Sequence, residues 1–334
     1  MNSLENKDKI YVAGANGMVG SAICRLLSKQ GYKDTKKNLL TPSRDELDLT
    51  NLYHVEKWFE RHNPQIVIIA AAKVGGIMAN MTRPVDFLLE NLKIQNNLIE
   101  TSWKFGVKRL VFLGSSCIYP KFSKQPIKEN YLLSNNLEET NQWYAIAKIA
   151  GLKLCQALKN QYNFDAISLM PSNLYGPKDN YDLNESHVMA ALIRKFYEAK
   201  INNKKEVLCW GSGKPLREFL YVDDLAEACI FLLNNWDPRI NNSPLDKNGN
   251  LLNWINVGSN FEISIKDLAK KIADIMNYKG KILWDADKPD GTLRKKLDTS
   301  CIQNLGWEAK TNLDIGIRST ISSYKKEILK RYEA

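Results

Sequence analysis

Two side chains in the segment "NQWYAIAK" have the types and the spacing of a proton-transfer pair. Tyr144 and Lys148 are four residues apart, so they lie on one face of a helix. An ammonium beside a phenol favours the phenolate, and we therefore expect Lys148 to lower the pKa of Tyr144 toward the working pH. The same spacing is common on amphipathic helices, so the pair needs support from other segments.

The segment "LGSSCIYP" supplies two further reactive side chains. Ser115 follows an apolar run that reads as a strand, and its hydroxyl is able to hydrogen-bond the same substrate oxygen as Tyr144. Cys117 is either a packed core thiol, which composition alone favours, or a thiol that acts in proton transfer as the thiolate. The residues alone leave both interpretations open.

A glycine-rich turn, "GANGMVG", comes directly after the first predicted strand and before a helix. Gly14, Gly17 and Gly20 form the pattern G-x-x-G-x-x-G. Glycines at these positions permit a tight turn and a close backbone approach to a pyrophosphate, and the helix N-terminus adds partial positive charge. The context predicts a dinucleotide site, with a purely structural turn as the alternative.

The end of the second predicted strand indicates which dinucleotide is preferred. A carboxylate at the strand tip would bind the 2′-hydroxyl of NAD, but this stretch, "LLTPSRDELDL", has Arg44 in the loop and no acid at the tip. A guanidinium suits a 2′-phosphate, so the sequence favours NADP(H). Arg44 as an ordinary solvated charge beside Asp45 is the alternative.

The elements that carry these residues alternate between strands and helices. This alternation predicts right-handed βαβ units and a doubly wound α/β fold with a parallel sheet covered on both faces. The predicted strands are 9–15, 37–43, 64–72, 107–116 and 165–173, and the predicted helices are 18–31, 52–63, 84–106 and 142–162.

The second half predicts a smaller mixed α/β substrate domain at the C-terminal side, interleaved with the first. A helix is predicted over 188–199, a strand over 255–259, and a helix beginning at the Ser-x-x-Asp of Ser264 and Asp267. We expect a Rossmann domain over 1–177, with return segments near 218–260, and a substrate-binding domain over 178–217 and 261–334.

Composition narrows the classes of function. The 334 residues carry a net charge of +10, which suggests an anionic partner, although a general adaptation of composition explains it equally well. No dense basic run predicts nucleic-acid binding, and no apolar stretch is long enough to span a membrane. Six scattered cysteines and three histidines favour reduced thiols in the cytoplasm and no metal site.

Taken together, these segments resemble the extended short-chain dehydrogenase/reductase family. From about residue 9 to residue 330 its landmarks occur in order: "GANGMVG", "AAAKVGG", "LGSSCIYP", "YAIAK", "MPSNLYGP" and "REFLYVDD". With "SHVMAALIRKF" and "KPDGTLRKKLD", the sequence is similar to the members that epimerise GDP-4-keto-6-deoxy-D-mannose at C3 and C5 and reduce its C4 ketone with NADPH to give GDP-L-fucose.

The resemblance implies a role for each matching residue. It assigns keto activation and reduction to Ser115, Tyr144 and Lys148, and base and acid in the epimerisation to Cys117 and His187. The implied NADP(H)-binding residues are Gly14, Asn16, Gly17, Met18, Val19, Gly20, Arg44, Leu113, Gly114, Ser115, Lys148, Pro171, Ser172, Asn173, Leu174 and His187. The implied nucleotide-sugar residues are Lys195, Trp210, Arg217 and Asp290.

Two positions depart from the family pattern. Lys195 stands where relatives often carry arginine, and it keeps the charge with less directional contact. Asn16 stands where some relatives place an arginine on the 2′-phosphate, so the NADP preference depends on Arg44. The resemblance also implies a homodimer through the helices near 85–103 and 142–160.

Three rival functions are compatible with these residues. One is the same chemistry on a related GDP-4-keto sugar, such as a colitose precursor or a heptose. Another is GDP-mannose 3,5-epimerase, which has a similar Ser-Cys-Ile-Tyr-Pro stretch but recycles its cofactor. The third is a non-catalytic NADP-binding redox sensor, which would have no need of the Tyr144 and Lys148 pair.

Overall fold

The central element is a six-stranded parallel sheet with the order β2-β1-β3-β4-β5-β9. The structure is a computed structural model and describes residues 4–5, 7–33, 35, 38–183, 185–239 and 243–333. Every residue of these strands is buried, as a parallel sheet covered on both faces requires. The strands are β1 (Ile10–Ala13), β2 (Leu39–Leu40), β3 (Ile66–Ile69), β4 (Arg109–Leu113), β5 (Ala166–Pro171) and β9 (Trp254–Val257).

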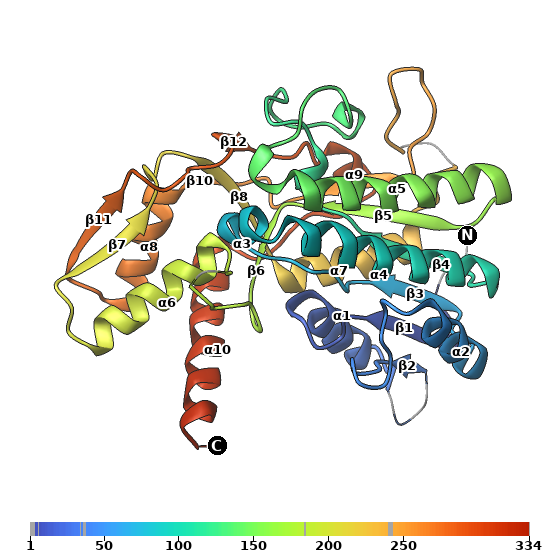
Figure 1. Cartoon of the computed structure of the whole chain (residues 1–334), viewed down its shortest axis with the longest axis horizontal. Helices are drawn as coiled ribbons and strands as arrows, with labels where there is room; N and C mark the ends of the chain where they lie inside the picture. The colour runs from blue at the N-terminus through green and yellow to red at the C-terminus, as the bar shows by residue number, and fades with distance from the viewer. Residues whose placement is uncertain are drawn as a thin grey trace.

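Helices cover both faces of this sheet (Figure 1). One apolar core joins the sheet to α1 (Met18–Lys29), α7 (Val222–Asn235) and α9 (Ser300–Asn304). The other joins it to α2 (Leu52–His62), α4 (Pro84–Lys104) and α5 (Gln142–Tyr162). The predicted doubly wound α/β fold is therefore confirmed.

A smaller group of elements has its own apolar core and lies to one side of the parallel sheet (Figure 1). Strand β8 (Leu216–Tyr221) is at its centre and pairs with β6 (Asn173–Tyr175), β10 (Glu262–Ser264) and β12 (Arg294–Lys295). A two-stranded sheet and three helices complete it: β7 (Glu206–Trp210), β11 (Lys281–Asp285), α6 (Val188–Ile201), α8 (Ile265–Met276) and α10 (Leu313–Glu333). The domain boundaries given above remain a prediction.

Several predicted helices coincide with the observed ones. Helix α5 has the predicted bounds, and α8 begins after Ser264, whose hydroxyl accepts a hydrogen bond from the Asp267 amide at 3.0 Å. That capping contact satisfies one of the free amides of the first turn. Helix α6 runs to Ile201, two residues beyond its predicted end.

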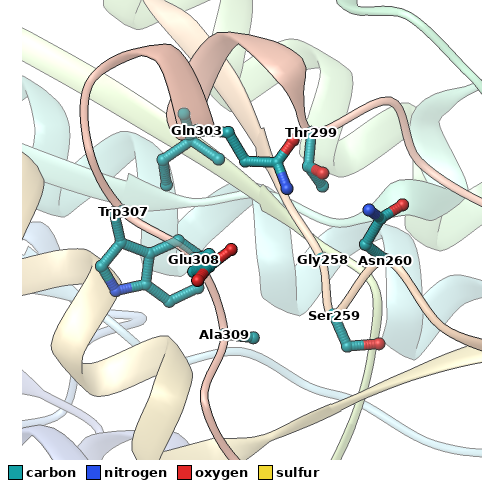
Figure 2. Close-up of a pocket in the computed structure, with 9 residues that line it drawn as sticks. Gly258, Ser259, Asn260, Thr299, Gln303, Trp307, Glu308 and Ala309 are labelled. Carbon is teal, nitrogen blue, oxygen red and sulfur yellow. The ribbon is translucent and has the colours of Figure 1, made fainter.

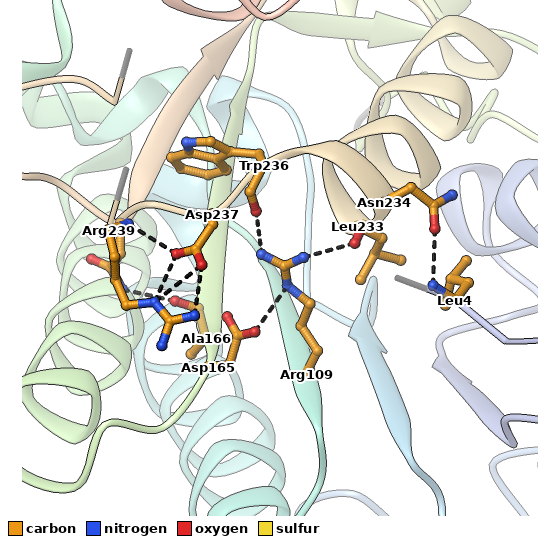
Figure 3. Close-up of polar contacts among 10 residues, drawn as sticks. Leu4, Arg109, Asp165, Ala166, Leu233, Asn234, Trp236, Asp237 and Arg239 are labelled. Atoms are coloured by element: carbon orange, nitrogen blue, oxygen red, sulfur yellow. Dashed lines mark hydrogen bonds and ion pairs between the residues drawn. The ribbon is translucent and has the colours of Figure 1, made fainter. Parts of the chain in front are cut away.

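A buried arginine fastens α7 to the middle of the sheet (Figure 3). Arg109, on β4, is 1% exposed and donates to the carbonyls of Leu233, at 2.7 Å, and of Trp236. Its Nε lies 3.4 Å from Asp165 Oδ2. Because the last carbonyls of a helix lack partners within the helix, the guanidinium both satisfies them and complements the negative end of α7.

The cysteines show no cross-links, since all six are free thiols. Within the described ranges, no group of three or more histidine, cysteine, aspartate or glutamate side chains is placed to hold a metal ion. None of the helices in that part of the chain combines the length and the apolar character needed to cross a membrane.

Candidate active site

The glycine-rich turn lies at the carboxyl edge of the parallel sheet, between β1 and β3. Gly14 has a φ of +82°, and a Cβ there would come within 2.8 Å of the Ala71 backbone. A Cβ on Gly20 would lie 2.1 Å from the Gly14 carbonyl oxygen, and Gly17 is the N-cap of α1. The backbone thus forms a cradle that side chains would fill, at the point where α/β sheets bind dinucleotides.

The other residues assigned to the dinucleotide follow the next strands along the same edge. Leu113 is the last residue of β4 and Gly114 follows it, while the segment 171–174 runs from the last residue of β5 into β6. In that segment the Ser172 hydroxyl is buried and has no hydrogen-bond partner among the described residues, so it is available to a ligand. With the glycine cradle, this unpaired hydroxyl means that the residues present fit a bound dinucleotide.

Arg44 and Asn16 lie at the outer end of this edge. The Arg44 side chain is exposed in the loop after β2 and borders a hollow of about 200 Å³ that the first turns of α4 also line. Asn16 is an exposed residue of the glycine turn. Both positions are open to solvent.

Ser115, Tyr144 and Lys148 come together at the end of β4. Lys148 is 3% exposed; its Nζ donates to the Leu113 carbonyl at 2.8 Å and lies 5.8 Å from the centre of the Tyr144 ring. Burial lowers the pKa of Lys148 to about 7. Tyr144 is hydrogen-bonded to the Ser115 side chain.

The expected depression of the Tyr144 pKa is not observed. Burial and, after it, the nearby Cys117 thiol raise the pKa of Tyr144 above its usual value of 10, and Lys148 does not offset them. The reason is that the lysine nitrogen is bound to a backbone carbonyl and is itself desolvated. Tyr144 is therefore a protonated hydroxyl, ready to donate a hydrogen bond or a proton.

Cys117 has two donors on its sulfur. It lies in the short helix η2 (Ser116–Ile118), where its amide donates to Ser115 Oγ at 3.2 Å. Asn141 Nδ2 lies 3.2 Å from its Sγ, and Lys295 Nζ lies 3.6 Å from the same atom. Both contacts bring polar hydrogens to the sulfur. Cys117 is thus a partly exposed thiol in a positive setting.

His187 is the N-cap of α6 and belongs to the smaller group of elements. Its side chain keeps an exposed surface, but crowding by protein atoms lowers its pKa, and the Lys295 ammonium lowers it further. Lys295 therefore influences both the thiol and the imidazole. An imidazole with a lowered pKa is a stronger acid when protonated.

The residues assigned to the nucleotide sugar form two pairs. Arg217 Nη2 lies 3.3 Å from the Asp290 carbonyl oxygen, while the Asp290 carboxylate accepts from the amide and the hydroxyl of Ser212, both at 2.7 Å. Lys195 Nζ lies 5.1 Å from the centre of the Trp210 ring. The carboxylate thus fixes the chain between β7 and β8, and Arg217 is a half-buried cation beside it.

Three residues of the site were missed in the sequence. Asn141 and Lys295 contact the Cys117 sulfur, and Lys288 Nζ lies 5.5 Å from the centre of the Trp210 ring. Asn141 comes three residues before Tyr144, and the two lysines lie in "KPDGTLRKK", the segment that also carries Asp290. The sequence of this segment could have indicated that a lysine lies at the site. It does not show which of its lysines contacts the Cys117 sulfur.

A separate hollow of about 230 Å³ lies beside α9 (Figure 2). Its lining is polar and comes from the segment after β9 and from α9 and the residues that follow it. None of the residues assigned above to the cofactor, the catalysis or the nucleotide sugar lines it. This hollow is therefore distinct from the candidate active site.

A glycine cradle for a dinucleotide beside a serine, a tyrosine and a lysine defines a dinucleotide-dependent oxidoreductase or epimerase. Residues 10–242 match the NAD dependent epimerase/dehydratase family. The chain belongs to this family.

Comparison with individual proteins is more specific. The chain is 50% identical to "GDP-L-fucose synthase 1" of Arabidopsis thaliana, over 99% of this chain and 98% of that protein. It is 46% identical to "GDP-L-fucose synthase" of Escherichia coli strain K12, over 94% and 96%. A solved structure, "MlghC, GDP-mannoheptose C4 reductase from Campylobacter jejuni with NADP bound", matches with a TM-score of 0.85 and 36% identity, over 97% and 100%.

Proposed function

We propose that this chain epimerises GDP-4-keto-6-deoxy-D-mannose at C3 and C5 and reduces the product at C4 with NADPH, which gives GDP-L-fucose. The observation that carries the proposal is the Cys117 thiol, held by Asn141 and Lys295 beside Ser115 and Tyr144. Reduction alone has no need of such a thiol. The relatives at 46 and 50% identity carry the name of this reaction.

In the epimerisation, a proton leaves a carbon next to the ketone and another returns on the opposite face. We assign the removal to the Cys117 thiolate and the return to the His187 imidazolium, because the two come from different parts of the fold. The Tyr144 and Ser115 hydroxyls would hydrogen-bond the enolate oxygen. A protonated tyrosine suits this task, since it donates without being ionised.

The same ketone serves the reduction. When bound, NADPH supplies the hydride that reduces C4. Tyr144 then donates its proton to the C4 oxygen, and Lys148, with a pKa near 7, is poised to gain or lose a proton near neutral pH. The residues that would hold the cofactor are the glycines of the turn, the segment 171–174 and Arg44.

The GDP part of the substrate is an anion with an aromatic base. Arg217 and Lys195 offer positive charge to the diphosphate, and Trp210, 40% exposed, offers an aromatic face to guanine. Lys288 adds a second ammonium near that ring. These cations are part of the excess positive charge of the chain, which has a net charge of +10. At the site they would attract an anionic substrate.

A related GDP-keto heptose is the second candidate substrate. It is favoured by the likeness to the GDP-mannoheptose C4 reductase. If the substrate is instead a colitose precursor, neither GDP-4-keto-6-deoxy-D-mannose nor the GDP-keto heptose would be the sugar that is consumed. Epimerisation with a recycled cofactor would differ in that no NADP⁺ accumulates.

We also propose that the chain acts as a homodimer in the cytoplasm. Helices α4 and α5 lie side by side (Figure 1), and their outer surface carries exposed apolar side chains. These are Val85, Leu89, Trp143 and Ile146, which are 65, 46, 40 and 40% exposed. Two such helix pairs would bury this surface as a four-helix interface.

The test of the function is product identification. The purified protein is given GDP-4-keto-6-deoxy-D-mannose and NADPH in deuterated water, and in parallel the GDP-keto heptose. We expect GDP-L-fucose with deuterium at C3 and C5, one NADP⁺ per sugar, and slower turnover of the heptose. In Cys117→Ser, deuterium entry should fall by about a hundredfold or more. A product that keeps the starting configuration, or cofactor that binds tightly without turnover, would contradict the proposal.

A further inference from the structure

A short helix, α3 (Ile77–Thr82), lies next to both groups assigned to the epimerisation. On one side it packs against η4 (Glu139–Asn141), whose last residue donates to the Cys117 sulfur at 3.2 Å. Its first residue approaches the segment that carries Lys295, since a Cβ built on Gly291 would be 3.3 Å from Ile77 Cδ1. Helix α3 therefore touches the surroundings of the thiol from two directions.

On its other side, the N-terminal turn of α3 contacts the loop that ends at His187. The Gly76 amide donates to the Glu185 carbonyl at 2.7 Å. A Cβ on Gly76 would lie 2.6 Å from the Ser186 carbonyl oxygen, closer than real Cβ atoms approach. The glycine is thus required by the close packing of two backbones, and the next residue after Ser186 is the imidazole.

Two side chains hold this contact in place. Asn80 is buried, and its Nδ2 donates to the carbonyls of Gly75 and Gly76 at 2.9 and 3.0 Å. Arg83, just after α3, pairs with Glu185 at 2.6 Å, although this pair is partly exposed and contributes little energy. The buried amide is the stronger constraint on the turn.

We propose that the Gly75–Gly76 turn and α3 form a positioning element that sets the imidazole of His187 relative to the thiol of Cys117. The inference rests on the proposed function. Inversion needs an acid and a base on opposite faces of one carbon, and such steps are sensitive to displacements of about 1 Å. The groups of the reduction, Ser115, Tyr144 and Lys148, are fixed by β4 and α5 instead.

The element therefore acts on inversion and not on proton removal. If the imidazole is displaced, the Cys117 thiolate still takes the proton, and its S–H exchanges with solvent. In deuterated water the thiol then returns a deuteron to the face it came from. Deuterium enters while the configuration is retained, and no oxidant or reductant is needed.

The decisive variant is Gly76→Ala, assayed in deuterated water with GDP-4-keto-6-deoxy-D-mannose and NADPH. We expect inversion at C3 and C5 to fall about a hundredfold relative to deuterium entry, with the KM for NADPH unchanged. Reduced GDP-6-deoxyhexose with the starting configuration should accumulate. Inversion and deuterium entry that fall together, or that both stay at the parent level, would overturn the positioning role.

Two further variants complete the test. Met81→Ala, on α3 with its side chain 52% exposed, is the matched control and should keep the parent ratio of inversion to deuterium entry. If Gly76→Ala does not fold, Asn80→Ser loosens the same turn without added bulk and should lower the ratio less; an unchanged ratio would overturn the proposal. A parent protein that incorporates no deuterium at C3 or C5 would refute the proposed function itself, which separates the two failures.

Discussion

At the residue scale, one ammonium acts on two reactive groups. Lys295 Nζ lies 3.6 Å from the Cys117 sulfur, and the same charge contributes, after burial, to the lowered pKa of His187. The ammonium is a hydrogen-bond donor to the sulfur, and its charge makes the imidazolium a stronger acid. Both effects favour the proton transfers that we assign to these groups.

Removal of this charge should change the rate and the pH dependence in predictable directions. In Lys295→Met, proton removal by Cys117 should slow by about tenfold to a hundredfold, because the sulfur loses its contact with the Lys295 Nζ. The pKa of His187 should rise toward its usual value. Since the acid acts only when protonated, its activity is lost as the pH rises through that pKa, so the alkaline limb should move to higher pH.

The measurement is inversion at C3 and C5 as a function of pH, since inversion needs the His187 acid, with deuterium entry recorded in parallel as the measure of proton removal. Lys296→Met is the matched control, because it removes the same charge at the next residue, just after β12, and its profile should equal that of the parent. An alkaline limb that stays in place, or moves to lower pH, in Lys295→Met would contradict the electrostatic coupling.

The sequence predicted the residues that lie inside short motifs, and it missed those that other segments bring to the site. Ser115 and Tyr144 were expected to share one substrate oxygen, and the structure places them in hydrogen-bond contact. Lys295 is 178 residues from Cys117 along the chain, so only the pairing of β12 with β8 reveals its place. The sign of the Tyr144 pKa shift was wrong because burial cannot be read from a spacing of four.

At the element scale, the sheet and its helices are joined by a few buried polar contacts. Arg109 fixes the end of α7 to β4. Helix α7 was not predicted, although its buried apolar residues recur at the helical period, at Val222, Leu225, Ala226, Cys229, Leu232 and Leu233. Helix α5 was predicted with its observed bounds, and it ends at Asn163 in the left-handed conformation.

The arginine tie can be tested by stability. In Arg109→Ala the carbonyls of Leu233 and Trp236 lose their donor and the Asp165 carboxylate loses its partner, so the free energy of unfolding should fall by about 3 kcal/mol. Arg239→Ala removes an exposed arginine from the same region and should cost about 1 kcal/mol or less. Urea unfolding monitored by circular dichroism measures both, and equal losses would contradict the argument.

At the scale of the whole molecule, the candidate site takes residues from the parallel sheet with its helices and from the smaller group of elements around β8. The turn at Gly14 and the helix with Tyr144 belong to the parallel sheet, whereas His187, Arg217 and Lys295 come from the elements around β8. Alternation of strands and helices was enough to predict the first group. In the second group, helices α6 and α8 were predicted, whereas short strands such as β12, with two residues, leave almost no local pattern.

The proposed dimer is a property of this whole arrangement. A lysine at the centre of an apolar helix interface must be desolvated without a partner, so Ile146→Lys should weaken association by about 2 kcal/mol or more, roughly thirtyfold in Kd. Light scattering should give twice the chain mass of 38.1 kDa for the parent protein and a mass near 38.1 kDa for the variant at micromolar concentration. Ile201→Lys changes an isoleucine of 58% exposure at the far end of α6 and should remain dimeric. A parent protein that is monomeric at all concentrations, or an Ile146→Lys variant as dimeric as the control, would show that this face serves another purpose.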